Sequence, residues 1–164
     1  MHNLGSLRIT TPSDREILIT RVFHAPRTLV WDTMTVPDLV KRWLSGPPGW
    51  SMQTCEDSLV PGSVYRWTWV GPEQNELVLT GVYKEVVKPE RVVRTEAFEI
   101  GCVPQADEKL ATLHLAEQGD KTVLTLTLSF SCKEARDGTL ASGMEHGLEA
   151  SYGNLETLLA GLQA

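Results

Sequence analysis

From residue 52 to residue 130, the chain is a succession of short apolar segments separated by turn residues. The apolar segments are rich in the β-branched and aromatic residues that favour strands, and proline, glycine and asparagine stand between them. Val60-Pro61-Gly62, for example, has the residue order of a type II turn. Such short connections join antiparallel neighbours, because parallel strands need a long crossover. We predict an antiparallel meander with strands at 52–57, 63–70, 77–87, 92–100, 109–116 and 122–130.

A first strand and two short helices precede this meander. Residues 16–24 have strand composition, and Ala25-Pro26 ends that strand. Proline is tolerated at the first position of a helix, because its missing N–H would be unpaired there anyway. Apolar residues then recur at helical intervals, with an interruption at Pro37. We therefore predict two short helices, at 26–34 and 37–43.

The last predicted strand and the C-terminal segment indicate how the sheet is covered. In residues 122–130, one face carries Leu124, Leu126, Leu128 and Phe130 and the other carries threonine and serine. This alternation is typical of an antiparallel sheet that is covered on one side. In residues 142–162, apolar residues recur three or four positions apart, which predicts a helix of about 20 residues. The resulting fold class is α+β: a curved antiparallel sheet wrapped around a long C-terminal helix, with two short helices after the first strand.

Composition narrows the class of protein further. The 164 residues fit a single domain, which we place at 15–164, after a flexible N-terminal extension at 1–14. Fifteen basic and 21 acidic residues give a net charge of −6, and no basic block is present, so we expect no nucleic-acid partner. No apolar run is long enough for membrane insertion, and the N-terminus has no secretion signal. We expect a cytoplasmic protein, monomeric or homodimeric.

The sequence contains no catalytic or metal-binding motif. Cys55, Cys102 and Cys132 are widely separated and odd in number, so reduced, packed thiols are expected. The four histidines lack metal-ligand spacing, and we expect neither a metal nor a cofactor. Arg21, Tyr83 and Glu96 are candidate internal polar groups. A carboxylate facing an apolar cavity would act as a general acid or base, whereas Glu96 beside an arginine also fits the solvent face.

Aromatic residues are concentrated in one part of the chain. All five tryptophans lie between Trp31 and Trp69, and Tyr65, Trp67 and Trp69 share one face of a predicted strand. Facing inward, they would form either the wall of a ligand pocket or part of a filled core. A twisted sheet on a single helix tends to leave a gap. Gly143, Gly147 and Gly153 in the final helix fit close approach of the sheet or room for a ligand.

Several segments, in chain order, resemble the activator-of-heat-shock-chaperone-ATPase homologue (AHSA-type) family. They are Phe23–Arg27 with Val30-Trp31, Arg42–Leu44 with Gly46–Trp50, Cys55-Glu56 with Pro61-Gly62, Gly81–Val86 with Pro89–Arg91, and Glu134–Asp137 with Ala141–Gly147 and Ser151-Tyr152. The resemblance covers residues 15–162. It implies the helix-grip fold of the START-like superfamily, also called Bet v-like or SRPBCC, in which a cavity between sheet and helix typically binds lipids, polyketides or other apolar molecules.

Our leading hypothesis is that the protein binds a hydrophobic small molecule, lipid-like or polyketide-like. The resemblance implies these candidate ligand-binding residues: Trp31, Trp43, Tyr65, Trp67, Trp69, Met144, Leu148 and Tyr152. Catalytic residues vary among branches of the superfamily, so none is assigned, and a cyclase-like or hydrolase-like enzyme is an alternative. A second alternative is a chaperone-interaction domain. Eukaryotic activators contact the chaperone through an additional N-terminal domain, so this role would use the helix-grip domain alone.

Overall fold

The structure is a computed structural model that describes residues 7–44, 49–100, 103–104 and 108–164. Its helices are α1 (Arg27–Thr35), α2 (Pro37–Trp43), α3 (Lys133–Ala141) and α4 (Met144–Gln163), with a short 3-10 turn η1 (Pro72–Gln74). Its strands are β1 (Arg8–Ser13), β2 (Glu16–Phe23), β3 (Ser51–Glu56), β4 (Val64–Val70), β5 (Glu76–Val87), β6 (Arg91–Ile100), β7 (Val103–Pro104), β8 (Lys109–Gln118) and β9 (Lys121–Ser129).

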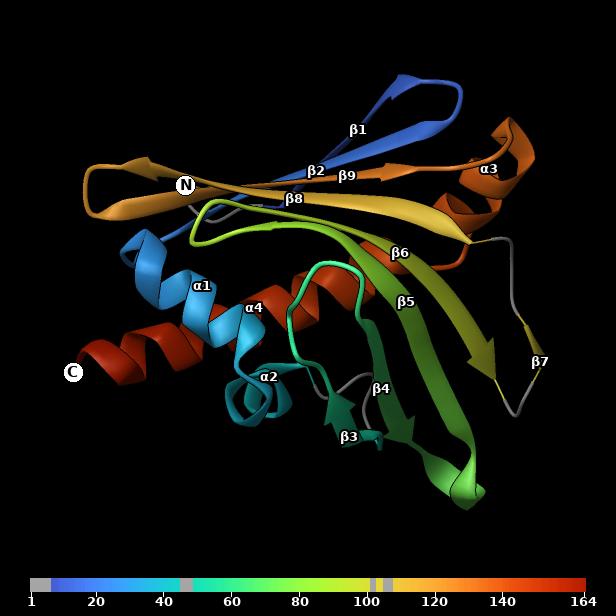
Figure 1. Cartoon of the computed structure of the whole chain (residues 1–164), viewed down its shortest axis with the longest axis horizontal. Coiled ribbons are helices and arrows are strands. Elements are labelled where there is room, and N and C mark those ends of the chain that lie inside the picture. The colour runs from blue at the N-terminus through green and yellow to red at the C-terminus, as the bar shows by residue number, and fades with distance from the viewer. Residues whose placement is uncertain (1–6, 45–48, 101–102, 105–107) are drawn as a thin grey trace.

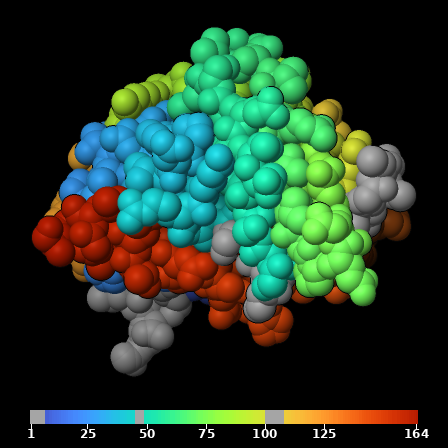
Figure 2. All heavy atoms as spheres, turned by 90° about the horizontal axis from the view of Figure 1, so that it is seen from below, coloured from blue at the N-terminus to red at the C-terminus, as the bar shows by residue number. Residues whose placement is uncertain are grey.

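The strands form one curved antiparallel sheet, and α4 lies across its concave side (Figure 1). The strand order is β1-β2-β9-β8-β6-β5-β4-β3, and the short β7 pairs with β6. Helices α1 and α2 pack against α4. In Figure 2, α4 is the red surface, and it lies along the blue and cyan surface of α1 and α2. This arrangement confirms the predicted α+β fold with its long C-terminal helix and two short helices.

The predicted meander is confirmed, and three elements were not predicted. Strand β1 lies within residues 1–14, which the sequence analysis assigned to an extension, and it pairs with β2 through Ile9 and Ile19. Strand β7 is too short to have a periodicity of its own. The C-terminal helix predicted at 142–162 is confirmed as α4, and the unpredicted helix α3 precedes it, separated by Gly143 with a φ of 86°.

Local chemistry explains the positions of the turns and bends. In the β3–β4 connection, the Ser63 N–H donates to the Val60 carbonyl at 2.9 Å and Gly62 has a φ of 88°, as the predicted type II turn requires. In β5, a Cβ atom at Gly81 would lie 1.9 Å from the Thr95 carbonyl oxygen. Glycine at this position therefore lets β5 and β6 approach closely where the sheet bends.

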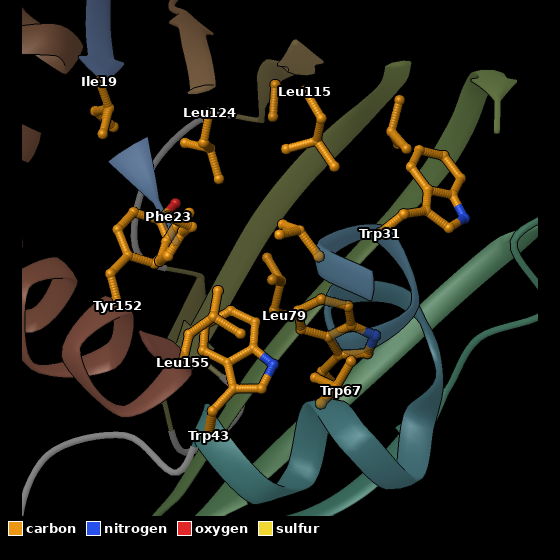
Figure 3. Close-up of a cluster of buried hydrophobic side chains, with 14 of the residues drawn as sticks. Ile19, Phe23, Trp31, Trp43, Trp67, Leu79, Leu115, Leu124, Tyr152 and Leu155 are labelled. Atoms are coloured by element: carbon orange, nitrogen blue, oxygen red, sulfur yellow. The ribbon is translucent and has the colours of Figure 1, made fainter. Parts of the chain in front are cut away.

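The core is sealed at one end of α4 and only partly covered at the other. Phe23, Leu115, Leu124, Leu155 and Leu159 are fully buried, and we call this group the sealed end; Figure 3 shows several of its side chains interlocked around α4. In the first turns of α4, Met144 and Leu148 pack against the core but are only partly buried, whereas Tyr152 in the following turn is buried. The helix therefore closes the concave face unevenly.

Gly143, Gly147 and Gly153 neither allow close approach of the sheet nor leave room for a ligand, the two roles that the sequence suggested. A Cβ atom added to Gly143, Gly147 or Gly153 would meet no atom within 4 Å apart from its immediate neighbours, and the first two residues are exposed. Their absent side chains neither bring the helix close to the sheet nor make room inside the core. Gly147 and Gly153 instead lower the intrinsic stability of the helix.

We predict that Gly147→Ala raises the free energy of unfolding by about 1 kcal/mol, because alanine removes the helix penalty of glycine without a clash. Urea denaturation followed by circular dichroism measures the change. Gly143→Ala is the control and should destabilise the protein, because its left-handed φ of 86° disfavours a side chain. Equal effects of the two substitutions would contradict this assignment.

Candidate ligand-binding site

The alternation of β4 places its aromatic residues on the concave face. Tyr65, Trp67 and Trp69 are buried there, while Arg66 between them is exposed on the opposite face. The ring centroids of Tyr65 and Trp67 are 5.7 Å apart, and those of Trp67 and Trp69 are 6.3 Å apart. These three rings form a continuous aromatic wall facing the layer between sheet and helix.

The structure brings the eight predicted ligand-binding residues into one apolar cluster. Trp31, Trp43 and Tyr152 are buried in the same core as the β4 aromatics, and Met144 and Leu148 pack against it. Trp43 and Tyr152 have ring centroids 6.2 Å apart (Figure 3). Whether these side chains touch a ligand stays a prediction.

Three charged side chains lie on this concave face and form a cluster that the sequence analysis did not identify. On β6, Arg94 and Glu96 occupy the same face as Val92 and Phe98, which belong to the core and its margin. The Nε and Nη2 atoms of Arg94 donate to Oε2 of Glu96 at 3.2 and 2.8 Å. On β8, Nζ of Lys109 lies 3.7 Å from Oε1 of Glu96. We call Arg94, Glu96 and Lys109 the Arg94 cluster.

The side chains of the Arg94 cluster are mostly buried but remain in contact with solvent. Their exposed fractions are 20% for Arg94, 10% for Glu96 and 12% for Lys109. The interpretation that Glu96 faces solvent is therefore wrong. The sequence signal was an arginine and a glutamate two positions apart between apolar residues of one strand face, which places both of them inward.

Aromatic rings hold the two cations of the cluster. The Arg94 guanidinium carbon lies 4.9 Å from the Tyr65 ring centroid and 4.8 Å from that of Trp67, and Lys109 Nζ lies 4.7 Å from that of Phe98. Burial opposes the charge on Arg94, but the attraction and hydrogen bonds of Glu96, together with Tyr65 and Tyr83, outweigh this effect and leave the pKa of Arg94 raised. The guanidinium therefore stays charged over the accessible pH range.

Asp57 joins the β3–β4 connection to the aromatic wall. Its Oδ2 accepts hydrogen bonds from Nε1 of Trp67 at 3.1 Å and from the hydroxyl of Tyr83 at 2.5 Å. Its Oδ1 accepts one from the N–H of Leu59 at 3.0 Å. Burial raises the pKa of Tyr83, and its hydrogen bond to Asp57 raises it further. The carboxylate is thus satisfied by three donors, and Tyr83 acts as a donor.

Three further titratable groups of this region have pKa values that are raised away from neutral pH. Burial raises the pKa of the Cys55 thiol to about 11, with a smaller contribution from Asp57. Burial likewise raises the pKa values of Tyr65 and Tyr152. Arg21 has other partners than the Arg94 cluster. Its guanidinium lies over the Phe23 ring, and its Nη1 atom lies 3.8 Å from Oε1 of Glu156.

The described residues contain no group of three or more histidine, cysteine, aspartate or glutamate side chains arranged to hold a metal ion. Cys55 and Cys132 are free thiols, and Cys102 lies outside the described residues. None of the described helices is long and apolar enough to cross a membrane. The site consists of the aromatic wall of β4 and the Arg94 cluster that contacts it.

A curved antiparallel sheet around a long C-terminal helix, with an aromatic inner face, defines a helix-grip protein of the START-like, or SRPBCC, class. Within this class, residues 24–160 match the family model described as "Activator of Hsp90 ATPase homolog 1-like protein". The chain belongs to this family.

Solved structures from several bacteria share the fold. A protein from Rhodobacter sphaeroides has 30% sequence identity and a TM-score of 0.88, over 94% of this chain and 98% of that chain. A protein from Nitrosomonas europaea has 23% identity and a TM-score of 0.80, over 93% of this chain and 99% of that chain. One from Mycobacterium smegmatis has 19% identity and a TM-score of 0.82, over 94% and 97% of the two chains. A search of functionally curated proteins found no significant match.

We predict that Tyr83→Phe lowers the free energy of unfolding by about 1.5–3 kcal/mol, because it removes a hydrogen bond to a charged acceptor. The matched control is Tyr65→Phe, which removes a hydroxyl bonded to the neutral carbonyl of Thr95 at 2.5 Å. It should cost about 0.5–1.5 kcal/mol. Urea denaturation compares the two, and a larger loss for Tyr65→Phe would contradict the assigned importance of Asp57.

We also predict slow alkylation of Cys55. With a pKa of about 11, the thiolate fraction at pH 8 is about 100-fold or more below that of an ordinary cysteine. Iodoacetamide labelling followed by peptide mass spectrometry measures the rate in native protein and, as a control, in urea. The native rate should still be rising with pH beyond pH 10, and a plateau below pH 10 would contradict the raised pKa.

Proposed function

We propose that the protein binds a hydrophobic small molecule between the N-terminal half of α4 and the concave face of β4, β5 and β6. The observation that carries the proposal is the uneven burial along α4. Leu155 and Leu159 are fully buried at the sealed end, whereas Met144 and Leu148 remain partly exposed although they face the core. Apolar side chains that face inward and still contact water are suited to burial by an apolar ligand.

The Arg94 cluster supports the same location. Its three side chains point to the concave face from the middle of the sheet and keep 10–20% of their surface exposed. Solvent therefore reaches the concave face at these residues. Tyr152 on α4 is within electrostatic range of both Arg94 and Glu96, so the helix and the cluster border the same region.

Binding fits the site better than acid–base catalysis. The pKa values of Tyr65, Tyr83 and Cys55 are all raised away from neutrality, and the pKa of Arg94 is raised as well. A general acid or base works best with a pKa near the operating pH. The cyclase-like or hydrolase-like alternative therefore receives no support from these shifts, and the chaperone interaction suggested by the family's name stays a prediction.

We predict that the protein binds Nile red, a neutral lipophilic dye, with a blue shift and an increase of dye emission that saturate at one dye per chain. Leu148→Trp adds bulk at the proposed site and should weaken binding about tenfold. Leu162→Trp is the matched control, because Leu162 is exposed near the end of α4 and its replacement should leave affinity unchanged. The proposal fails if the wild-type protein does not bind the dye, or if both variants bind it equally well.

A further inference from the structure

The Arg94 cluster contains two cations and one carboxylate. Arg94 occupies Oε2 of Glu96 through two hydrogen bonds. Lys109 lies 3.7 Å from Oε1, which is beyond hydrogen-bond distance. Within the described part of the chain, the Lys109 ammonium has no hydrogen-bond acceptor, and its recorded contacts are Glu96 and the Phe98 ring. These three side chains together carry one net positive charge, and no described protein group accepts a hydrogen bond from the Lys109 ammonium.

Neither neighbouring acidic residue accepts a hydrogen bond from Lys109. Asp57 is occupied by the Trp67 indole, the Tyr83 hydroxyl and the Leu59 N–H, which together satisfy both of its oxygens. Glu108 precedes Lys109 in the chain and is exposed to solvent. The side chain of Lys109 is mostly buried, and its ammonium lies beyond hydrogen-bond distance of Glu96, so an anion beside it would provide a charge-assisted hydrogen bond that the described protein groups do not.

We infer that the ligand is an amphipathic molecule with a single carboxylate. The carboxylate accepts hydrogen bonds from Lys109, and the apolar part lies between Trp67, Phe98 and the Met144–Leu148 side of α4. This inference rests on the proposed function and adds a charge requirement to it.

The test compares octanoate with 1-octanol, which have the same chain length and differ in their polar group. Isothermal titration calorimetry at pH 7 and low ionic strength measures both affinities, with tryptophan fluorescence as a second readout. We expect octanoate to bind about tenfold or more tightly than 1-octanol to the wild-type protein, as a charge-assisted hydrogen bond requires. Lys109→Met should reduce this preference to about twofold or less by weakening octanoate binding, with 1-octanol binding unchanged.

Two further variants separate the charge of Lys109 from general effects. Lys109→Arg retains the cation and should retain the preference, and Lys84→Met removes an exposed lysine of β5 and should leave it unchanged. Thermal melting followed by circular dichroism checks that each variant folds. If Lys109→Met does not fold, Lys109→Gln is used in its place. Equal wild-type binding of both compounds, or a preference that survives loss of the Lys109 charge, overturns this inference and leaves the proposed function intact. Binding of neither compound contradicts both.

Discussion

A single helix cannot cover the whole concave face of a sheet that bends as strongly as this one. Within the curved sheet, β5 and β6 approach so closely at Gly81 that any side chain there would collide with the Thr95 carbonyl, and their register shifts between Tyr83 and Glu85. On one side of the bend, α4 and the strands β2, β8 and β9 interlock through fully buried leucines and Phe23. On the other side, β4 to β6 turn away from the helix (Figure 1), and the face carries aromatic and charged side chains beside Leu79. The location of the proposed site is a consequence of this geometry.

The charged cluster is not explained by stability alone. Replacing a buried ion pair by well-packed apolar side chains is often neutral or stabilising, because desolvation costs about as much as the attraction returns. Here the cost is lowered by cation–π contacts of Arg94 with Tyr65 and Trp67. These rings, together with the two hydrogen bonds to Glu96, also fix the guanidinium in one orientation. The result is a rigid polar surface within an apolar one, which is the usual composition of a small-molecule site.

Most of the fold was predictable from local sequence, and the polar part of the site was not. The structure of several elements follows from a few neighbouring residues. In β9 the signal is strict alternation, and around α1, α2 and the β3–β4 turn it is the positions of proline and glycine. Strand β1 has no such signal: Arg8–Ser13 contains few apolar residues and becomes a strand by pairing with β2. The Arg94 cluster depends on the register of β6 with β8, which brings Lys109 opposite Glu96. Register is a long-range property, and no pattern within β6 or β8 alone specifies that pairing.

The attachments of α4 have the same asymmetry as its burial. In the C-terminal half, Glu156 accepts a hydrogen bond from the His24 backbone N–H at 3.3 Å and lies 3.1 Å from the His24 ring, and Gln163 donates to the His24 carbonyl at 3.0 Å. These contacts fasten that half to the end of β2, where the core is sealed. The N-terminal half begins at Gly143 and contains Gly147, so it combines weaker helix propensity with incomplete burial. Segments with few buried apolar contacts open at the lowest free-energy cost. By this criterion, the first turns of α4, which border the proposed site, are less firmly attached to the sheet than Leu155 and Leu159.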